Sequence, residues 1–350
     1  MNHLFATIKR PMTRIAAVGL SLCLLLTSLV LFTGCGQKQG VYTTSYMDTF
    51  DTVLTVTVGA DTNEQATQWT TALHDIALDL HKQFTVYTPI ADLNNLYTVN
   101  NYAGNDAPVK VSKEILELLT IGKDMHTLSD GAVNICMGNL LSEWRSAKDY
   151  GRVPHQALVD VYLREQSSIS SLSIDGRNGT VQITRGNTAL DVGAIAKGYV
   201  LEKMREYAEK EGITSLLVNF GGQVMAIGRH PDGKPWTVAI RDPRDGSELT
   251  VIEVEDAVVA TSADDQRNFT VDGVTYHHII DPATGYPARS YRSVTVILPL
   301  GHTSYSDGFS TALFIMNREK GQELISRYNG SALWLTAEGE VMEYNWPDQK

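Results

Sequence analysis

Strand-like runs separated by hairpin signals most constrain what this chain of 350 residues can fold into. The clearest run is Thr52 to Val58 (TVLTVTV), which is rich in β-branched residues. Residues 169–174 and 180–184 flank DGRNG, a sequence typical of a tight turn between two strands. Further strand-like segments cover residues 215–220, 236–240, 249–254, 258–261, 271–280, 293–298 and 331–336.

Apolar residues at helical spacing are confined to fewer segments. They recur over residues 64–84 and 113–128, in a helix that ends near residue 211, and over residues 307–316. Because strands outnumber helices and hairpin signals recur, we expect an α+β fold with largely antiparallel sheets and packed helices, and not alternating βαβ units.

The N-terminal segment has the organisation of a targeting sequence. Lys9, Arg10 and Arg14 precede the uncharged apolar run 15–32, and FTGC then places Cys35 after a small residue. We interpret residues 1–34 as a lipoprotein signal peptide and Cys35 as the lipidated first residue of the mature chain. The alternative is an uncleaved membrane anchor, because the run reaches the ~18 residues that can span a bilayer.

Either interpretation places the remaining chain at the extracytoplasmic face of the cell membrane. Residues 35–45 are small and polar, and we expect them to be the lipidated cysteine and a flexible tether. Residues 46–350 then form the functional domain, which is long enough to bury a large core.

The acidic balance of the chain excludes one class of partner. The net charge is −11, and removal of residues 1–34, which hold three basic residues and no acidic one, leaves −14. A nucleic-acid-binding surface needs a basic footprint, so we expect no nucleic-acid partner. Attachment to anionic lipid by charge is equally disfavoured, so the acyl chain should hold the protein at the membrane.

Cysteine usage offers neither a disulfide nor a metal pattern. Cys23 leaves with the signal peptide and Cys35 carries lipid, so Cys136 remains alone. A small buried residue is the favoured interpretation of Cys136, and a nucleophile is the alternative.

The stretch LDVGAIAKGYV, residues 190–200, combines an acid, a lysine and two glycines where a helix begins. A helix N-terminus with uncovered backbone and a lysine favours phosphate, which makes Lys197 a candidate phosphate ligand. Asp191 could bind a hydroxyl, a base edge or a metal. The spacing matches neither of the usual glycine-rich nucleotide motifs, and a tight turn with a surface lysine is the alternative.

Two further stretches end strands with polar residues. In VNFGG, Asn219 precedes Gly221 and Gly222, whose bare backbone would allow close approach of a flat or bulky group, or would simply form a turn. In HHIIDPATG, His278 and Asp281 lie at a strand end before a turn. We interpret His278 as a residue that can accept a proton from a hydroxyl.

The stretch SDGFSTA suggests a metal site. Asp307 and Thr311 are four residues apart and would share one face of a helix. Carboxylate and hydroxyl oxygens are hard ligands suited to Mg²⁺. A capping role for Asp307 is the alternative.

Taken together, these stretches resemble the ApbE family, the FAD:protein FMN transferases, over nearly the whole mature chain. The similarity is carried, in the family's order, by SYMDTFDTVLTVTV, FTVYTPIADLNNLY, LSDGAVNICMGNLLSEW, LDVGAIAKGY, VNFGG, HHIIDPATGYP and SDGFSTALFIM. The chain departs from the family pattern at Asp48, Ala91-Asp92, Cys136, Ala263 and Asp265. In VVATSADDQRNF, which also resembles a family motif, Thr261, Ser262 and Arg267 are retained.

The resemblance implies an α+β architecture related to T-fold modules. It also implies an enzymatic reaction. Family members bind FAD with Mg²⁺ and move the FMN part onto a Ser or Thr hydroxyl of a partner protein, forming a phosphoester and releasing AMP. The partner implied here is an extracytoplasmic redox protein. The alternatives are an FAD pyrophosphatase, which would give FMN and AMP, and a non-catalytic FAD-binding lipoprotein.

The resemblance also implies roles for individual residues. His278 would assist the attacking hydroxyl, and Lys197 would neutralise the phosphates. The residues implied for the metal are Ala194, through its carbonyl, Asp307, Ser310 and Thr311. Those implied for FAD are Met47, Tyr87, Ser129, Asp130, Gly131, Asp191, Lys197, Asn219, Gly221, Gly222, Thr261, Ser262 and Asp281.

Overall fold

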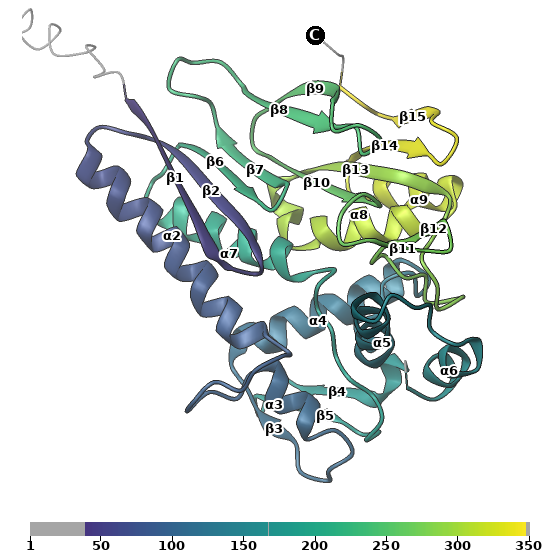
Figure 1. Cartoon of the computed structure of the whole chain (residues 1–350). Coiled ribbons are helices and arrows are strands. Elements are labelled where there is room, and N and C mark those ends of the chain that lie inside the picture. Colours follow the sequence, from purple (N-terminus) through teal and green to yellow (C-terminus); the bar gives the residue numbers. More distant parts are fainter. Residues whose placement is uncertain (1–38, 167, 348–350) are drawn as a thin grey trace, which may run out of the picture. The chain divides into compact units, whose positions relative to one another are not determined.

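A computed structural model describes residues 39–166 and 168–347 of the chain, and its centre is an eight-stranded antiparallel sheet (Figure 1). The signal peptide and Cys35 lie outside the described residues. The strands, in spatial order, are β1 (Gly40–Thr49), β2 (Thr52–Ala60), β6 (Ser215–Phe220), β7 (Gln223–Gly228), β10 (Ala257–Ala263), β13 (Tyr291–Pro299), β14 (Ser331–Thr336) and β15 (Val341–Tyr344).

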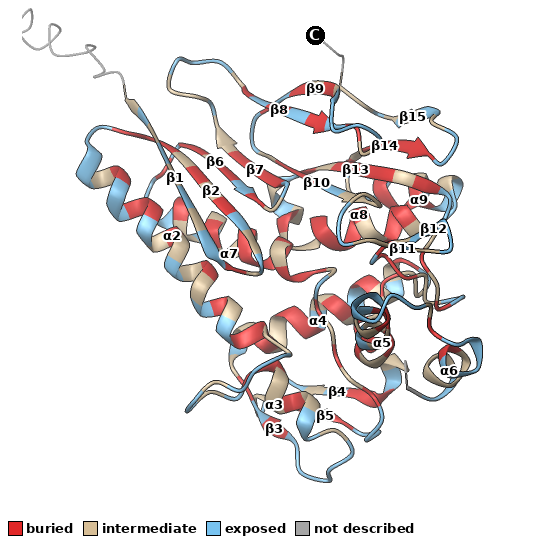
Figure 2. Cartoon of the chain, viewed as in Figure 1, coloured by how far each residue is buried: buried red, intermediate tan, exposed pale blue. Residues whose placement is uncertain are grey.

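Four helices pack against one face of this sheet. They are α2 (Asn63–Phe84), α7 (Ala196–Lys210), α8 (Ser306–Ile315) and α9 (Arg318–Ser326), and the 3₁₀ segment η3 (Leu300–Tyr305) leads into α8. Thr62 starts α2 by accepting a hydrogen bond from the backbone N–H of Gln65. The core lies between this helical layer and the sheet, where Figure 2 shows the buried residues gathered.

A hairpin covers part of the opposite face of the sheet. Strands β8 (Trp236–Arg241) and β9 (Glu248–Val254) pair with each other and alternate buried and exposed residues along much of their length. Their inward residues, among them Trp236 and Ile252, pack on Val224 and Val259 of β7 and β10. Both faces of the middle strands are therefore buried.

The remaining elements form a second group beside the helical layer (Figure 1). They are α3 (Leu96–Asn101), β3 (Val109–Lys110), α4 (Lys113–Leu128), α5 (Gly138–Asp149), α6 (Gln156–Val161), η1 (Tyr162–Gln166), η2 (Ile169–Ser171), β4 (Leu172–Asp175), β5 (Thr180–Ile183), β11 (Phe269–Val271) and β12 (Val274–Tyr276). Strands β3, β5 and β4 form a small antiparallel sheet, and β11 pairs with β12.

Helix α5 is fixed by Trp144. Its indole is 5% exposed and donates a hydrogen bond of 2.8 Å to the carbonyl oxygen of Gly285. The aromatic rings of Phe269, Tyr276 and Tyr286 surround it. The loop around Gly285 is thereby attached to α5, which places α5 near the segment that carries His278.

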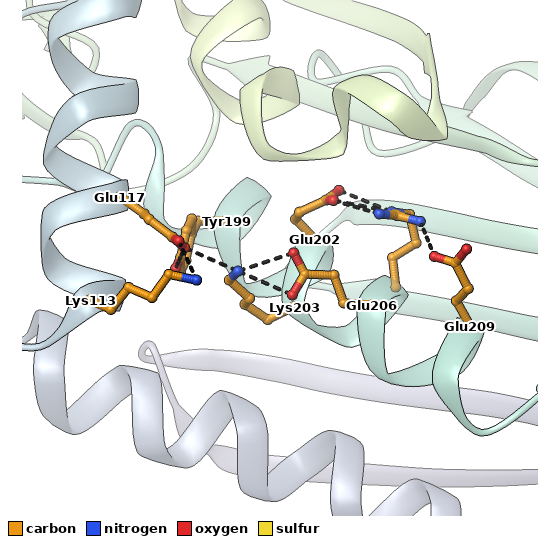
Figure 3. A network of polar contacts seen from close by, with 8 residues as sticks. Lys113, Glu117, Tyr199, Glu202, Lys203, Glu206 and Glu209 are labelled. Atoms are coloured by element: carbon orange, nitrogen blue, oxygen red, sulfur yellow. Dashed lines mark hydrogen bonds and ion pairs between the residues drawn. The ribbon is translucent and has the colours of Figure 1, made fainter.

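A polar network ties α7 to α4 (Figure 3). Tyr199 donates a hydrogen bond of 2.6 Å to Glu117, which also pairs with Lys113 and Lys203. Burial disfavours ionisation of Glu117, but these three donors outweigh it and lower its pKa to about 2. Glu117 is therefore charged at neutral pH and holds α7 just beyond Lys197.

The structure confirms the predicted α+β class with antiparallel sheets and corrects two boundaries. The tether expected over residues 35–45 is too long, because β1 begins at Gly40 and pairs with β2 from that residue on. The strand expected over 271–280 is divided: β11 and β12 are short, and residues 277–280 lie outside both strands. Helix α7 starts at Ala196, within the stretch 190–200 where the sequence predicts that a helix begins.

Gly138 controls how closely α5 approaches the chain before α7. A Cβ atom there would lie 2.7 Å from the carbonyl oxygen of Ala189 and 2.8 Å from that of Leu190. We expect Gly138→Ala to lower the free energy of unfolding by about 1 to 3 kcal/mol, because backbone cannot move aside. Urea denaturation measures this. Gly176→Ala, whose Cβ would meet nothing within 4 Å, is the control; equal stability of the two variants would contradict the packing.

Candidate active site

The first turns of α7 and α8 lie against each other and define the centre of the site. A Cβ atom on Gly198 would lie 3.0 Å from the carbonyl oxygen of Ser304 and 3.1 Å from that of Thr303. The side-chain amide of Gln223, at the start of β7, donates a hydrogen bond of 2.6 Å to Ser306 at the start of α8. The start of an inner strand and two helix N-termini therefore meet here.

Lys197 and Asp307 form an ion pair across this junction. The Lys197 ammonium is 2.9 Å from Oδ1 and 3.0 Å from Oδ2 of Asp307. The side chains are 26% and 10% exposed, so the pair is partly shielded from water. The structure thus joins two residues, 110 positions apart, that the sequence assigned to phosphate and to metal.

Three hydroxyl groups lie next to Asp307, and they differ in availability. Ser310 is 1% exposed, and its hydroxyl donates a hydrogen bond to the backbone carbonyl of Asp307. The hydroxyl oxygen of Ser262 lies 2.9 Å from Ser310 Oγ and 3.3 Å from Thr311 Oγ1. Thr311 is only partly buried. Of the two α8 hydroxyls predicted as metal ligands, Thr311 is the more accessible, and Ser310 is engaged within the helix.

Thr261 and Ser262 point to opposite faces of β10. Successive side chains of a strand alternate, and Ser262 faces α8. Thr261 instead lies 2.8 Å from the hydroxyl of Thr295 on the neighbouring strand. Only Ser262 of this predicted FAD-binding pair therefore reaches the Asp307 group.

The donor set around Asp307 fits a hard cation. It comprises the carboxylate of Asp307 and the hydroxyl of Thr311, one turn later on α8. The carbonyl of Ala194, in the turn before α7, stays a predicted third donor. No group of three or more His, Cys, Asp or Glu residues that could hold a metal occurs within the described part of the chain. One carboxylate with neutral oxygens suits Mg²⁺ bound together with a substrate phosphate better than a metal bound by protein alone.

His278 is positioned as a neutral imidazole. Its Nδ1 lies 3.1 Å from the carbonyl oxygen of Gln266. A carbonyl can only accept, so Nδ1 carries the hydrogen and Nε2 keeps a free lone pair. Crowding by protein atoms, and then the charge of Arg267, lower the pKa of His278 to about 4, although the residue remains in contact with solvent.

A second group of side chains gathers around Asp191. Arg145 of α5 donates a hydrogen bond of 3.0 Å to Asp191 Oδ2, and its guanidinium lies 5.3 Å from the ring centroid of Tyr87. Burial, and next the charge of Asp191, raise the pKa of Tyr87, which the charge of Arg145 and then that of Arg267 oppose.

Arg145 contacts two predicted site residues, Asp191 and Tyr87, and sequence reasoning missed it. It follows the stretch that carries the family resemblance, and no spacing rule connects α5 with a loop 46 residues later. The one available signal was its position directly after Trp144, a residue that anchors its helix.

The VNFGG stretch forms a hairpin turn. Gly221 and Gly222 have φ values of +61° and +89°, which is typical of a two-residue turn between antiparallel strands. Asn219 accepts a hydrogen bond of 2.9 Å from the N–H of Gly222. A Cβ on Gly221 would lie 2.5 Å from Thr52 Oγ1, so the glycine also permits close packing on the β1–β2 turn. Contact with a ligand stays a prediction for these three residues.

Other predicted FAD-binding residues have their own structural partners. Ser129 is 1% exposed and bonds within its turn, and Asp130 pairs with Lys320 of α9 at 2.8 Å. Gly131 has a φ of +87°. Asp281 accepts from the N–H of Ala283. In the part of the chain that the structure describes, we see no hydrogen bond or ion pair between these four residues and Lys197 or Asp307. Their contact with FAD therefore stays a prediction.

The structure also gives the surroundings of Met47 and of three residues that depart from the family pattern, Asp48, Cys136 and Asp265. Met47 is 79% exposed. Asp48 lies 2.8 Å from His74 of α2, and Asp265 pairs with Arg241 of β8. Cys136 is buried and free, and burial raises the pKa of its thiol to about 12. The prediction that Cys136 is a small buried residue is confirmed.

Comparison with known proteins agrees with this arrangement. A model of the ApbE family matches residues 50–334. The chain belongs to the ApbE family. The FAD:protein FMN transferase of Treponema pallidum is 32% identical over 275 residues, which cover 74% of this chain and 75% of that protein. The FAD:protein FMN transferase of Salmonella typhimurium is 28% identical and covers 69% and 70%.

Solved structures of ApbE proteins share the fold. The ApbE protein of Thermotoga maritima superimposes with a TM-score of 0.77 at 27% identity and covers 87% of this chain and 97% of its own. The flavinyl transferase ApbE of Pseudomonas stutzeri, in its apo form, gives a TM-score of 0.73 at 26% identity, with 88% and 95% covered. The ApbE-like architecture predicted from the sequence is thereby confirmed.

The neutral state of His278 can be tested by NMR titration. We expect the ring resonance that disappears in His278→Gln to titrate near pH 4, since crowding and Arg267 disfavour the cation. Because the folded pKa lies below the usual value of about 6.5, the associated stability is complete above pH 6.5 and is lost as pH falls toward 4. A midpoint at or above 6.5 would contradict the assignment.

Proposed function

We propose that this protein transfers FMN from FAD to a Ser or Thr hydroxyl of an acceptor protein, with Mg²⁺ and with release of AMP. Membership of the ApbE family makes the chain a flavin transferase by class. The observation that carries the finer proposal is the Lys197–Asp307 pair at two adjoining helix N-termini, which combines a cation with an oxygen ligand for a metal.

Phosphoryl transfer depends on charge neutralisation and positioning more than on covalent help from the protein. Lys197 would exchange Asp307 for the pyrophosphate of FAD, which frees both carboxylate oxygens. Asp307, Thr311 and the Ala194 carbonyl would then hold Mg²⁺. When bound, the ion would stabilise the negative charge that develops on the departing AMP oxygen.

The proposed transfer forms one bond to phosphorus and breaks another. The acceptor oxygen forms a bond with the phosphorus of the FMN phosphate, and the bond from that phosphorus to the bridging oxygen breaks. AMP leaves with the electron pair. The hydroxyl proton passes to Nε2 of His278, which is neutral and has its other nitrogen committed to Gln266.

One observation keeps hydrolysis as a second candidate. His278 is in contact with solvent, so water could occupy the position of the acceptor hydroxyl. The products would then be FMN and AMP. A non-catalytic FAD-binding lipoprotein would need neither a base nor a metal-binding carboxylate.

We further propose that Cys35 carries a lipid that holds the protein at the extracytoplasmic face of the cell membrane. The basic residues, apolar run and FTGC order support this assignment. Within residues 39–166 and 168–347, no helix combines the length and apolarity needed to cross a bilayer. With β1 starting at Gly40, four residues would separate Cys35 from the sheet, so the domain would work close to the lipid surface.

The transferase proposal predicts paired products. Incubation of the full chain in mild detergent with FAD, Mg²⁺ and a Thr-bearing acceptor domain should add one FMN mass to the acceptor and release equal AMP. Asp307→Ala should lower the rate by roughly 100-fold or more, because a major charge-stabilising group is lost. Intact mass and AMP are read together. AMP and free FMN without an adduct would identify a hydrolase, and bound FAD without AMP would contradict an enzyme.

The lipid proposal predicts a change of cell fraction. The wild-type chain expressed in a bacterium should sediment with membranes and carry the mass of an acylated N-terminus at Cys35. Cys35→Ala should abolish the acyl mass and block cleavage of the signal peptide. Cys23→Ala, which alters a cysteine inside the apolar run, is the matched control. An unmodified Cys35 in the membrane fraction would contradict the proposal.

A further inference from the structure

The loop of residues 264–268, between β10 and β11, carries the carbonyl that fixes the tautomer of His278. Nδ1 of His278 lies 3.1 Å from the carbonyl oxygen of Gln266, to which it donates. A neutral imidazole can carry its hydrogen on either nitrogen, and the hydrogen bond decides which one. The availability of Nε2 as a base therefore depends on where this loop holds Gln266.

The two ends of the loop are attached to strand β13 and to each other. The N–H of Asp264 donates to the carbonyl of Arg292 at 2.9 Å, and Nε of Arg292 donates back to the Asp264 carboxylate at 2.8 Å. The side-chain amide of Asn268 donates to the carbonyl of Asp264 at 3.0 Å. These three bonds fix the base of the loop, but they do not reach its tip at Gln266 and Arg267.

An ion pair with strand β8 anchors the loop next to its tip. Arg241, the last residue of β8, donates a hydrogen bond to Oδ2 of Asp265, which directly precedes Gln266. The Arg241 side chain is 49% exposed and that of Asp265 only 15%. Oδ1 of Asp265 is buried and has no hydrogen-bond partner in the part of the chain that the structure describes. A partly buried carboxylate of this kind depends on its cation, so Arg241 keeps Asp265 in place.

The tip of the loop needs such an anchor because it is strained and open to solvent. Arg267 has a φ of +47°, in the left-handed region that a bulky residue adopts only where its surroundings hold it. Gln266 and Arg267 are both exposed, so packing of their side chains contributes little. Without the anchor, the backbone would relax and the Gln266 carbonyl would move away from His278.

We infer that Arg241 is a positioning residue for the reaction: through Asp265 it holds the Gln266 carbonyl against Nδ1 of His278, which keeps Nε2 free to take the proton of the acceptor hydroxyl. This inference rests on the proposed function, in which His278 is the base. Arg241 lies outside every motif on which the family resemblance rests. Asp265, its partner, is one of the departures from the family pattern, so this anchor belongs to the present chain.

The first measurement is the tautomer of His278 at neutral pH, read from the nitrogen NMR shifts of its imidazole in the labelled full chain in mild detergent. His278→Gln identifies the signals. In the wild-type chain, Nδ1 should carry the hydrogen. Arg241→Ala should shift part of the population to the Nε2–H tautomer, because the Gln266 carbonyl no longer holds the hydrogen on Nδ1. Arg241→Lys, which keeps the charge without the planar fork, should retain more of the Nδ1–H form.

The second measurement separates kcat from FAD affinity in the transfer assay. A well-placed general base contributes roughly 100-fold or more, so its partial misplacement in Arg241→Ala should lower kcat by about tenfold. The affinity for FAD should stay near the wild-type value, because Arg241 acts on the base and not on the ligand. In a His278→Gln background, Arg241→Ala should lower kcat no further, since it has no base left to position. If the chain hydrolyses FAD, the same cycle is read from AMP release.

Arg229 supplies a matched control at the opposite end of β10. It pairs at 2.7 Å with Glu255, in the turn that leads into β10, and its side chain is 53% exposed. Arg229→Ala should change neither the His278 tautomer nor kcat. Because Arg241→Ala leaves a partly buried carboxylate unpaired, thermal unfolding checks that it folds. Asp265→Asn, which removes that charge and keeps the shape, is the second variant and should give the same changes to a smaller degree.

Three results would overturn the inference. The first is an unchanged His278 tautomer in folded Arg241→Ala and Asp265→Asn. The second is an unchanged kcat in both variants of an active chain. The third is an equal loss of kcat with and without His278, which would give Arg241 a general structural role. Failure of the proposed function looks different, because the wild-type chain itself would then produce neither an adduct nor AMP. The positioning role would fall with it, while the NMR result would still report whether Arg241 controls the tautomer.

Discussion

The contact between Lys197 and Asp307 is the interaction on which the arrangement of the site depends. A lysine and an aspartate from two different helices meet at 2.9 and 3.0 Å where both helices begin. A helix N-terminus already favours negative charge, and Asp307 lies in the first turn of α8. The lysine adds a positive centre beside it. The result is a compact charged junction, which under the proposed function would exchange its internal ion pair for a phosphate on the lysine and a divalent cation on the aspartate.

Much of the surrounding structure serves to bring these two helix starts together. Gly198 allows α7 to approach the backbone of η3, and Gln223 ties the start of strand β7 to Ser306. Farther along α7, the Tyr199–Glu117 bond and Lys203 attach the helix to α4 (Figure 3). Because hydrogen bonds to Glu117 outweigh its burial, this attachment persists through the physiological pH range.

An acidic protein can still bind a dinucleotide because local charge decides the contact. The chain has a net charge of −11, yet Lys197 and Arg145 both contact residues of the candidate site. Each already has a carboxylate partner, Asp307 for Lys197 and Asp191 for Arg145. Such pairs keep the cations aligned before a ligand arrives, which lowers the entropy lost on binding.

Local sequence patterns were enough to predict the fold class and the family, and they nominated most residues of the candidate site. Turn-forming residues and β-branched runs act locally, so they predicted antiparallel strands, and the motifs around Lys197, His278 and Asp307 are short. Tertiary structure alone decided which members of each motif face the site. Strand alternation turns Thr261 away from Ser262, and the first turn of α8 occupies Ser310 but leaves Thr311 accessible.

Only the folded chain could place Arg145 beside Asp191 and Tyr87, since these residues come from three separate segments. Their meeting is fixed by the close approach of Gly138 to Ala189 and by the attachment of Trp144 to Gly285. Such long-range contacts depend on packing and not on local propensity, and so they leave no periodic signal in the sequence.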